Sequence, residues 1–253
     1  MRKSLIFACL LMLLALLFIP TNFVFAQNNN ESNFFKEPTS PHLINVDRNV
    51  SNNEVKETVT LGKLTQEQNE ELKFELPFNF EEGEDIKINR DEEGNLLNSA
   101  NIYDAYGNSI GIISFENNSN IQLIEKDGKS LELRITSQQD TVDITYLIAS
   151  YSYDDYFYSS DWIERDGIIS LSIDPKPLLW ESGIFDWASI RNDSWQKLLD
   201  GHVNDDQFYN QNGMKDQYSC HFDFAKGNKT PWNIEPSRPD VGYIETVLNG
   251  CNP

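Results

Sequence analysis

The feature that most constrains the fold is a series of short segments between Glu54 and Ser152 in which apolar and polar residues alternate. A period of two is typical of strands that bury one face. Turns at Glu93-Gly94, Tyr106-Gly107 and Asp127-Gly128 separate several of them, and glycine there supplies the positive φ of a tight hairpin. We therefore predict an antiparallel β meander folded as a sandwich or an open barrel. The expected strands are Thr58–Leu61, Leu72–Phe78, Ile86–Asn89, Asn101–Tyr106, Ser109–Phe115, Ile121–Lys126, Ser130–Thr136 and Val142–Tyr151.

A change of pattern near Asp161 predicts a boundary between a β-rich domain over residues 54–160 and a small α+β domain over residues 161–253. The second domain opens with two strands around Asp166-Gly167 and continues with segments of helical periodicity. The predicted fold class is therefore α+β. The expected helices are Ser189–Leu199, closed by Gly201, then Gly213–Cys220, and finally Val241–Leu248, capped by Asp240.

The first residues have the pattern of a cleaved secretory signal peptide. Arg2 and Lys3 form a positive start, and Leu5–Pro20 is an almost unbroken apolar run. Val24 and Ala26 suit a signal peptidase, which places the cut after residue 26. The alternative is a retained membrane anchor, but the run is shorter than the ~20 residues that a spanning helix prefers. We expect a secreted, extracellular protein without a stable transmembrane anchor after processing.

Residues 27–53 are rich in Asn, Ser and Glu, contain Pro38 and Pro41, and have little apolar periodicity. Such a composition favours a flexible leader or a propeptide. Whether residues 27–53 are removed from the mature protein is left open.

The charge balance excludes some partners. The chain has 20 Lys+Arg against 40 Asp+Glu, and removal of the signal peptide takes away two basic and no acidic residues, which leaves a net charge of −22. A negative field of this strength repels phosphate backbones, so we expect no nucleic-acid partner and no unaided docking to anionic lipid.

Cys9 lies in the signal peptide, so the mature chain retains Cys220 and Cys251. Two cysteines in an exported domain predict a disulfide. For a loop of this length the chain-entropy model gives about 3–4 kcal/mol of stabilisation. Ligation of a metal by two lone cysteines is the alternative, although neither belongs to a CxxC pair.

Several short motifs follow one another in the C-terminal part. They are Trp162-Ile163-Glu164-Arg165-Asp166-Gly167, Ser170-Leu171-Ser172, Cys220-His221-Phe222-Asp223-Phe224, Trp232-Asn233-Ile234-Glu235-Pro236-Ser237-Arg238-Pro239 and Cys251-Asn252-Pro253. In this order they resemble the secreted bacterial family known as domain of unknown function 2599. The whole layout also resembles the large heat-labile bacteriocins of the geobacillin type from thermophilic bacilli. That second resemblance implies a secreted antibacterial protein.

Four residues near the cysteines are candidates for catalysis. His221 could act as a general base oriented by Asp223, with Glu235 as an acid and Arg238 beside them. The alternative is a buried charge network in which Arg238 pairs with Glu235 or Asp223 and His221 bonds a backbone carbonyl. We favour this alternative, because proximity along the chain does not define a site geometry.

Aromatic residues are candidates for binding a glycan or an envelope surface. The alternative is that most of them are core, since a small domain needs bulky side chains to bury enough area. The candidates are Trp162, Trp195, Trp232, Tyr156 and Tyr158.

An HExxH motif, a P-loop and a Rossmann glycine pattern do not occur in the sequence. With only His42, His202 and His221 present, a histidine-rich zinc site is not expected, and we predict neither a metal nor a cofactor. Calcium at Asp205-Asp206 or Asp91-Glu92-Glu93 is left open, although neither has EF-hand spacing.

Three functions remain as hypotheses. The first is a bacteriocin-like antagonist that binds a component of the bacterial cell envelope or the target-cell surface. The second is a cell-wall hydrolase that uses His221 and a nearby carboxylate. The third is an adhesion module that binds the envelope without killing.

Overall fold

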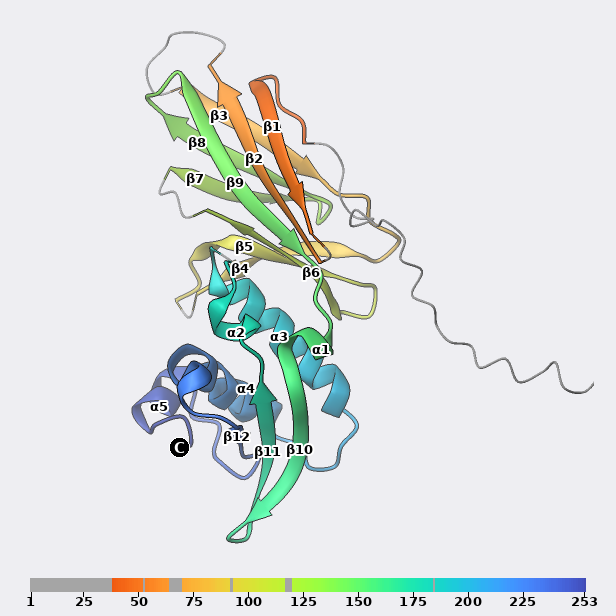
Figure 1. Cartoon of the computed structure of the whole chain (residues 1–253), viewed down its shortest axis with the longest axis vertical. Helices are drawn as coiled ribbons and strands as arrows, with labels where there is room; N and C mark the ends of the chain where they lie inside the picture. Colours follow the sequence, from red (N-terminus) through yellow and green to blue (C-terminus); the bar gives the residue numbers. More distant parts are fainter. Residues whose placement is uncertain (1–37, 52, 64–69, 92, 117–119, 184) are drawn as a thin grey trace, which may run out of the picture. The chain divides into compact units, whose positions relative to one another are not determined.

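The computed structural model describes residues 38–253, except 52, 64–69, 92, 117–119 and 184. The N-terminal part is built from two antiparallel sheets (Figure 1). One has the strand order β1-β2-β9-β6-β5-β4 and the other has the order β3-β8-β7. The strands are β1 (Leu43–Val50), β2 (Glu54–Gly62), β3 (Glu70–Pro77), β4 (Asp85–Arg90), β5 (Leu96–Tyr103), β6 (Ser109–Phe115), β7 (Ile121–Lys126), β8 (Ser130–Ser137) and β9 (Thr141–Ala149).

The two sheets pack face to face as a sandwich. Side chains from β3 and β8, such as Phe74 and Leu133, are fully buried against side chains from β2, β6 and β9, such as Leu61, Phe115 and Tyr146. Alternation along the strands sends these residues to one face, as the sequence pattern predicts. The α+β class is confirmed, and of the two expected forms the sandwich is the one observed.

Two expectations for this part were wrong. The strands do not form a simple meander, because β9 pairs with both β2 and β6 and lies between them in the sheet. The expected leader is also folded in part: Leu43–Val50 forms β1 and pairs with β2 in antiparallel register. This edge strand exposes most of its side chains, which is why its sequence lacks the apolar pattern of an interior strand.

The predicted glycine turns are confirmed. Gly94, Gly107 and Gly128 have φ values of +86°, +88° and +63°. In the turn before β6, Asp104 Oδ1 accepts the backbone N–H of Tyr106 at 2.9 Å and that of Asn108 at 2.8 Å. The Asp104 carboxylate thus accepts hydrogen bonds from backbone N–H groups of the turn that have no partner in the neighbouring strand.

The C-terminal part joins a second three-stranded sheet, of order β10-β11-β12, to a group of helices. The expected hairpin around Asp166-Gly167 is formed by β10 and β11. β12 lies in the proline-bounded segment and adds a third strand to the sheet. The elements are α1 (Tyr153–Tyr156), β10 (Phe157–Arg165), β11 (Ile168–Pro175), α2 (Leu178–Glu181), α3 (Trp187–His202), α4 (Gln211–Cys220), a π-helical turn η1 (His221–Ala225), a 3-10 turn η2 (Lys226–Asn228), β12 (Trp232–Ile234) and α5 (Tyr243–Leu248).

The helices differ from the expectation at their ends. α3 passes through Gly201 and ends at His202, and its N-cap Asp186 accepts the N–H of Ala188 at 2.9 Å. α5 begins later than expected because Gly242, with φ +81°, is its N-cap instead of Asp240. Within the described residues, no helix combines the length and the apolar character needed to cross a membrane.

Helix α3 covers the outer face of the six-stranded sheet at β5 and β6. Ile112, Leu147 and Ala149 on that face share one apolar cluster with Ile190 and Leu198 of α3. Polar contacts accompany this packing. They are Asn101 Nδ2 to the Ser189 carbonyl at 3.2 Å, Asn192 Nδ2 to Asn89 Oδ1 at 2.9 Å and the Asp186 N–H to Ser114 Oγ at 2.8 Å.

We expect Tyr156→Phe to destabilise the protein by about 1–3 kcal/mol, because a buried carboxylate would lose a hydrogen bond. The Tyr156 hydroxyl donates to Asp193 Oδ2 at 2.6 Å, and both residues are buried. Burial raises the pKa of Asp193. Urea unfolding followed by tryptophan fluorescence measures the change. Tyr158→Phe is the matched control, because Tyr158 is 64% exposed, and equal effects of the two variants would contradict the expectation.

Candidate functional site

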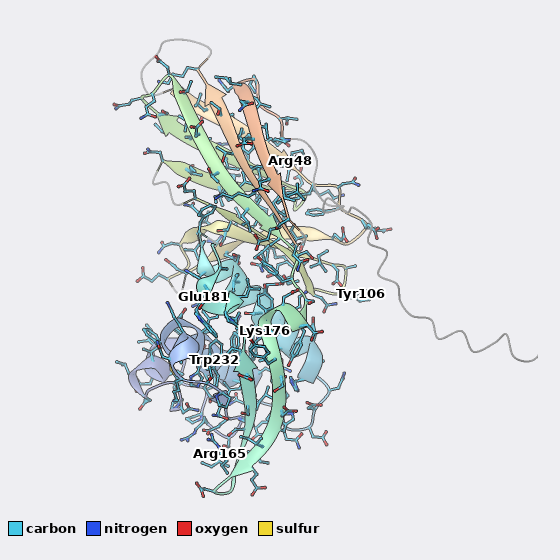
Figure 2. The ribbon with its side chains drawn as sticks, viewed as in Figure 1. Arg48, Tyr106, Arg165, Lys176, Glu181 and Trp232 are labelled. Atoms are coloured by element: carbon cyan, nitrogen blue, oxygen red, sulfur yellow. A yellow bond between two sulfur atoms is a disulfide. The ribbon has the colours of Figure 1, made fainter. Side chains whose placement is uncertain are left out.

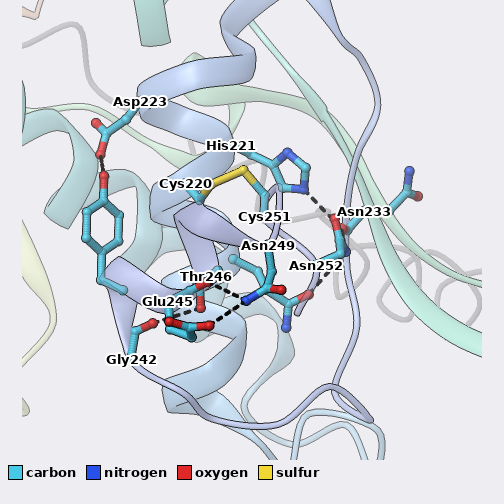
Figure 3. The surroundings of a disulfide bond; sticks show 12 residues. Cys220, His221, Asp223, Asn233, Gly242, Glu245, Thr246, Asn249, Cys251 and Asn252 are labelled. Carbon is cyan, nitrogen blue, oxygen red and sulfur yellow. Dashed lines mark hydrogen bonds between the residues drawn. A yellow bond between two sulfur atoms is a disulfide. The ribbon is translucent and has the colours of Figure 1, made fainter.

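The C-terminal end of the chain is fixed to α4 by a disulfide. Cys220, the last residue of α4, is bonded to Cys251, which follows α5, with a Cα–Cα distance of 5.4 Å (Figure 3). The predicted disulfide is therefore confirmed. Its position beside His221 makes this end of the molecule the place where most of the predicted site residues meet.

Strand β12 is held from several sides near this disulfide. The Gln217 side chain forms two hydrogen bonds with the backbone of Glu235, at 2.9 and 3.0 Å. Asn252 Nδ2 donates to the Asn233 carbonyl at 3.1 Å, and the ring of His221 reaches the same carbonyl at 3.2 Å. The side chains of Gln217, His221 and Asn252 thus provide hydrogen-bond partners for backbone groups in and next to this short strand.

His221 is a buried, neutral imidazole. Its side chain is almost completely covered, and burial lowers its pKa to about 4. Because a carbonyl can only accept, Nε2 carries the proton, and Nδ1 keeps its lone pair. In the described part of the chain, Nδ1 has no hydrogen-bond partner. A general base must reach its substrate, and this one is covered by the ring of Trp232, 6.4 Å away between centroids.

The neighbouring carboxylates are paired with other groups. Asp223 accepts from the Tyr243 hydroxyl at 2.5 Å (Figure 3). It also accepts from Arg191 at 2.8 Å. Glu235 accepts from Arg238 at 2.5 Å. These contacts are those of the structural network that the sequence favoured, with Arg238 paired to Glu235 and His221 bonded to a carbonyl. Among the residues that the structure describes, no hydrogen bond joins His221 to either carboxylate as a catalytic pair.

The aromatic candidates divide into core and surface. Trp195, Trp232 and Tyr156 are buried, so they belong to the core and cannot contact a partner. The buried indole N–H of Trp232 has a hydrogen-bond partner, because it donates to the Lys226 carbonyl at 3.0 Å. Trp162 is partly buried, and Tyr158 is exposed beneath the ammonium of Lys176. Only the last two remain available as surface residues.

The acidic loop at Asp91 is held by hydrogen bonds within the loop. Among the residues that the structure describes, no group of three or more His, Cys, Asp or Glu side chains is arranged to hold an ion. Asp91 of the first acidic loop accepts the backbone N–H groups of Glu93 and Asn95 at 3.0 and 2.8 Å. A hydrogen bond from the Asn95 side chain at 2.9 Å, together with these backbone bonds, lowers the pKa of Asp91.

A second polar constellation was missed by sequence reasoning. Ser160 Oγ lies 2.6 Å from His202 Nε2, and His202 Nδ1 lies 2.8 Å from Asp205 Oδ2. Asp205 Oδ2 also accepts from Trp162 Nε1 at 2.8 Å, and the Tyr153 hydroxyl lies 2.5 Å from Ser160 Oγ. The spacing of His202 and Asp205 at the end of an expected helix was a usable signal, but Ser160 is far away in the sequence and joins them only through the fold.

The fold and the disulfide define the C-terminal part as a small, stapled α+β module. Residues 158–253 match the family described as "Protein of unknown function (DUF2599)", which confirms the resemblance of the C-terminal motifs. Uncharacterized proteins of Mycobacterium bovis and Mycobacterium tuberculosis are 43% identical to this chain over 44 residues, which is 16% of this chain and 30% of each relative. The chain therefore spans less than a third of these curated relatives. No solved structure matches it.

Removal of the disulfide by Cys220→Ser should cost about 3–4 kcal/mol, because the bond closes a loop with a sequence separation of 31. Chemical unfolding of the variant and the oxidised protein measures the difference. The reduced wild type should unfold like the variant. If the variant and the reduced wild type were as stable as the oxidised protein, the expectation would be contradicted, because β12 and α5 would stay docked without the bond.

The stability of the protein should fall as the pH drops from about 6.5 towards 4, because His221 protonates in the unfolded chain before it protonates in the folded one. The loss should reach about 2–3 kcal/mol. In His221→Gln this contribution is absent, so the variant should lose less free energy of unfolding over the same range. Parallel pH profiles for the two proteins would argue against a buried neutral imidazole.

Proposed function

We propose that this chain is a secreted antibacterial protein that binds at the envelope of other bacteria through its C-terminal module. The observation that carries the proposal is an exposed apolar face on α5 that the disulfide holds in place. Ile244 and Leu248 lie four residues apart, on one side of the helix, and are 70% and 74% exposed.

Export is supported by the start of the sequence and by the disulfide. Residues 1–26, which carry the signal-peptide pattern, lie outside the described residues. The Cys220–Cys251 bond suits an oxidising compartment, where such bonds persist. Both observations favour an extracellular protein.

The α5 face is suited to binding because its apolar residues are exposed and its backbone is fixed. Tyr243 at the start of α5 bonds Asp223, and Cys251 anchors the residues that follow the helix. A fixed surface loses little conformational freedom on association, which favours affinity. The large negative charge of the chain disfavours an anionic bilayer, so we infer a neutral or cationic envelope component as the partner.

The hydrolase that would use His221 gains no such support, because His221 is covered and both nearby carboxylates are engaged with arginines. An adhesion module that does not kill remains as an outcome of the test below.

The purified chain without residues 1–26 should bind whole Gram-positive cells and inhibit the growth of related strains. Ile244→Ser combined with Leu248→Ser should weaken cell binding at least tenfold, because exposed apolar anchors dominate such contacts. Sedimentation of labelled protein with cells, together with inhibition zones on a strain panel, measures both effects.

Tyr106→Ser is the matched control, because Tyr106 is 91% exposed on a turn of the N-terminal part (Figure 2). This variant should bind like the wild type. Binding without inhibition on the whole panel would identify an adhesion module, whereas unaltered binding by the α5 variant would remove that helix from the interface.

A further inference from the structure

Three side chains from two separate segments form a connected hydrogen-bonded chain on the C-terminal module. Ser160 lies on β10, an edge strand of its sheet, whereas His202 ends α3 and Asp205 follows it. The distances of 2.6 Å from Ser160 to His202 Nε2 and 2.8 Å from His202 Nδ1 to Asp205 join them in order. Nucleophile, base and orienting carboxylate have this mutual geometry in serine hydrolases of unrelated folds.

When the imidazole of His202 is neutral, the hydrogen bonds that join Ser160, His202 and Asp205 allow one consistent placement of the protons. Bonds from His202 and Trp162 lower the pKa of Asp205, so its carboxylate is an acceptor and His202 Nδ1 carries a proton. His202 Nε2 then has a free lone pair, and Ser160 must donate to it. The Tyr153 hydroxyl is left as the donor to Ser160 Oγ, and burial raises the pKa of Tyr153 and keeps its proton in place.

The surroundings fix the imidazole and leave the serine within reach of solvent. The rings of Trp162 and Phe208 each lie 6.1 Å from that of His202 between centroids. Ser160 is partly exposed, and the Asp205 side chain is 38% exposed. This is the opposite of His221, which is buried away from any substrate.

We propose that Ser160 is a nucleophile, with His202 as its general base and Asp205 as the positioning carboxylate, and that the module thereby hydrolyses carboxylic esters. This activity goes beyond the proposed binding function and uses none of its residues.

The reaction balances with water as the co-reactant. Ser160 Oγ bonds to the acyl carbon while its proton passes to His202 Nε2, and the same proton then leaves with the departing alcohol as the ester C–O bond breaks. Water next attacks the acyl-serine and gives a proton to His202, and Ser160 recovers a proton as the acid is released. The Tyr153 hydroxyl, 2.5 Å from Ser160 Oγ, holds the serine in place for this attack.

The charge around the site selects the substrate class. Asp161 and Asp206 lie next in sequence to Ser160 and Asp205, and Asp205 is itself ionised. Anionic esters are repelled by such a group of carboxylates. We therefore expect uncharged or cationic esters to be the substrates.

The test is labelling of the full mature chain with an uncharged fluorophosphonate, followed by peptide mass spectrometry. The wild type should carry the phosphonyl group on Ser160. Ser160→Ala should abolish both labelling and the hydrolysis of p-nitrophenyl acetate. Ser159→Ala, which alters the exposed neighbouring serine, should leave both unchanged.

Asp205→Asn separates a positioning role from a purely structural one. We expect it to slow labelling on the order of 100-fold or more, with nearly unchanged thermal stability. Absence of a label on Ser160 in the folded wild type would overturn the proposal, as would equal labelling of Ser160→Ala. Either result leaves cell binding by α5 intact, so the two proposals fail independently.

Discussion

The burial of β5 and β6 on both faces of the six-stranded sheet is the constraint on which the rest of the structure depends. Adjacent residues of β6 serve different cores: Ile113 points into the sandwich, and Ile112 contacts the cluster built around α3. The pleat of the strand makes this division necessary. Helix α3 packs on the outer face of β5 and β6, so the sheet fixes the position of the helix. It thereby also fixes the position of His202 at the end of α3.

The same constraint explains which parts of the fold could be predicted. Strands with one solvated face, such as β8, follow a period of two and were identified from the sequence. β1 was missed because an exposed edge strand needs few apolar residues. The pairing of β9 with β2 and β6 could not be predicted either, since local turn residues specify hairpins but not the order of distant strands in a sheet.

The candidate sites show a similar limit. Residues close together in the sequence, such as His221 and Asp223, proved to point to different partners, and the burial of His221 follows from packing that a motif does not encode. Ser160 and His202, 42 residues apart, are brought together where the end of α3 meets β10. The disulfide was predictable from the cysteine count, because the predicted signal peptide takes Cys9 and leaves two cysteines to pair.

The long separation between β2 and β9 also bears on how the chain reaches its folded state. These two strands pair along their whole lengths, although most of the sandwich lies between them in the sequence. Pairing of this kind is slow, because a large loop must close before any of its contacts form. A chain exported by the general secretory route must stay unfolded until it has crossed the membrane. For the export that we propose, late closure of this strand pair would keep the chain unfolded during passage, and it would expose the edges of β2 to aggregation during the delay.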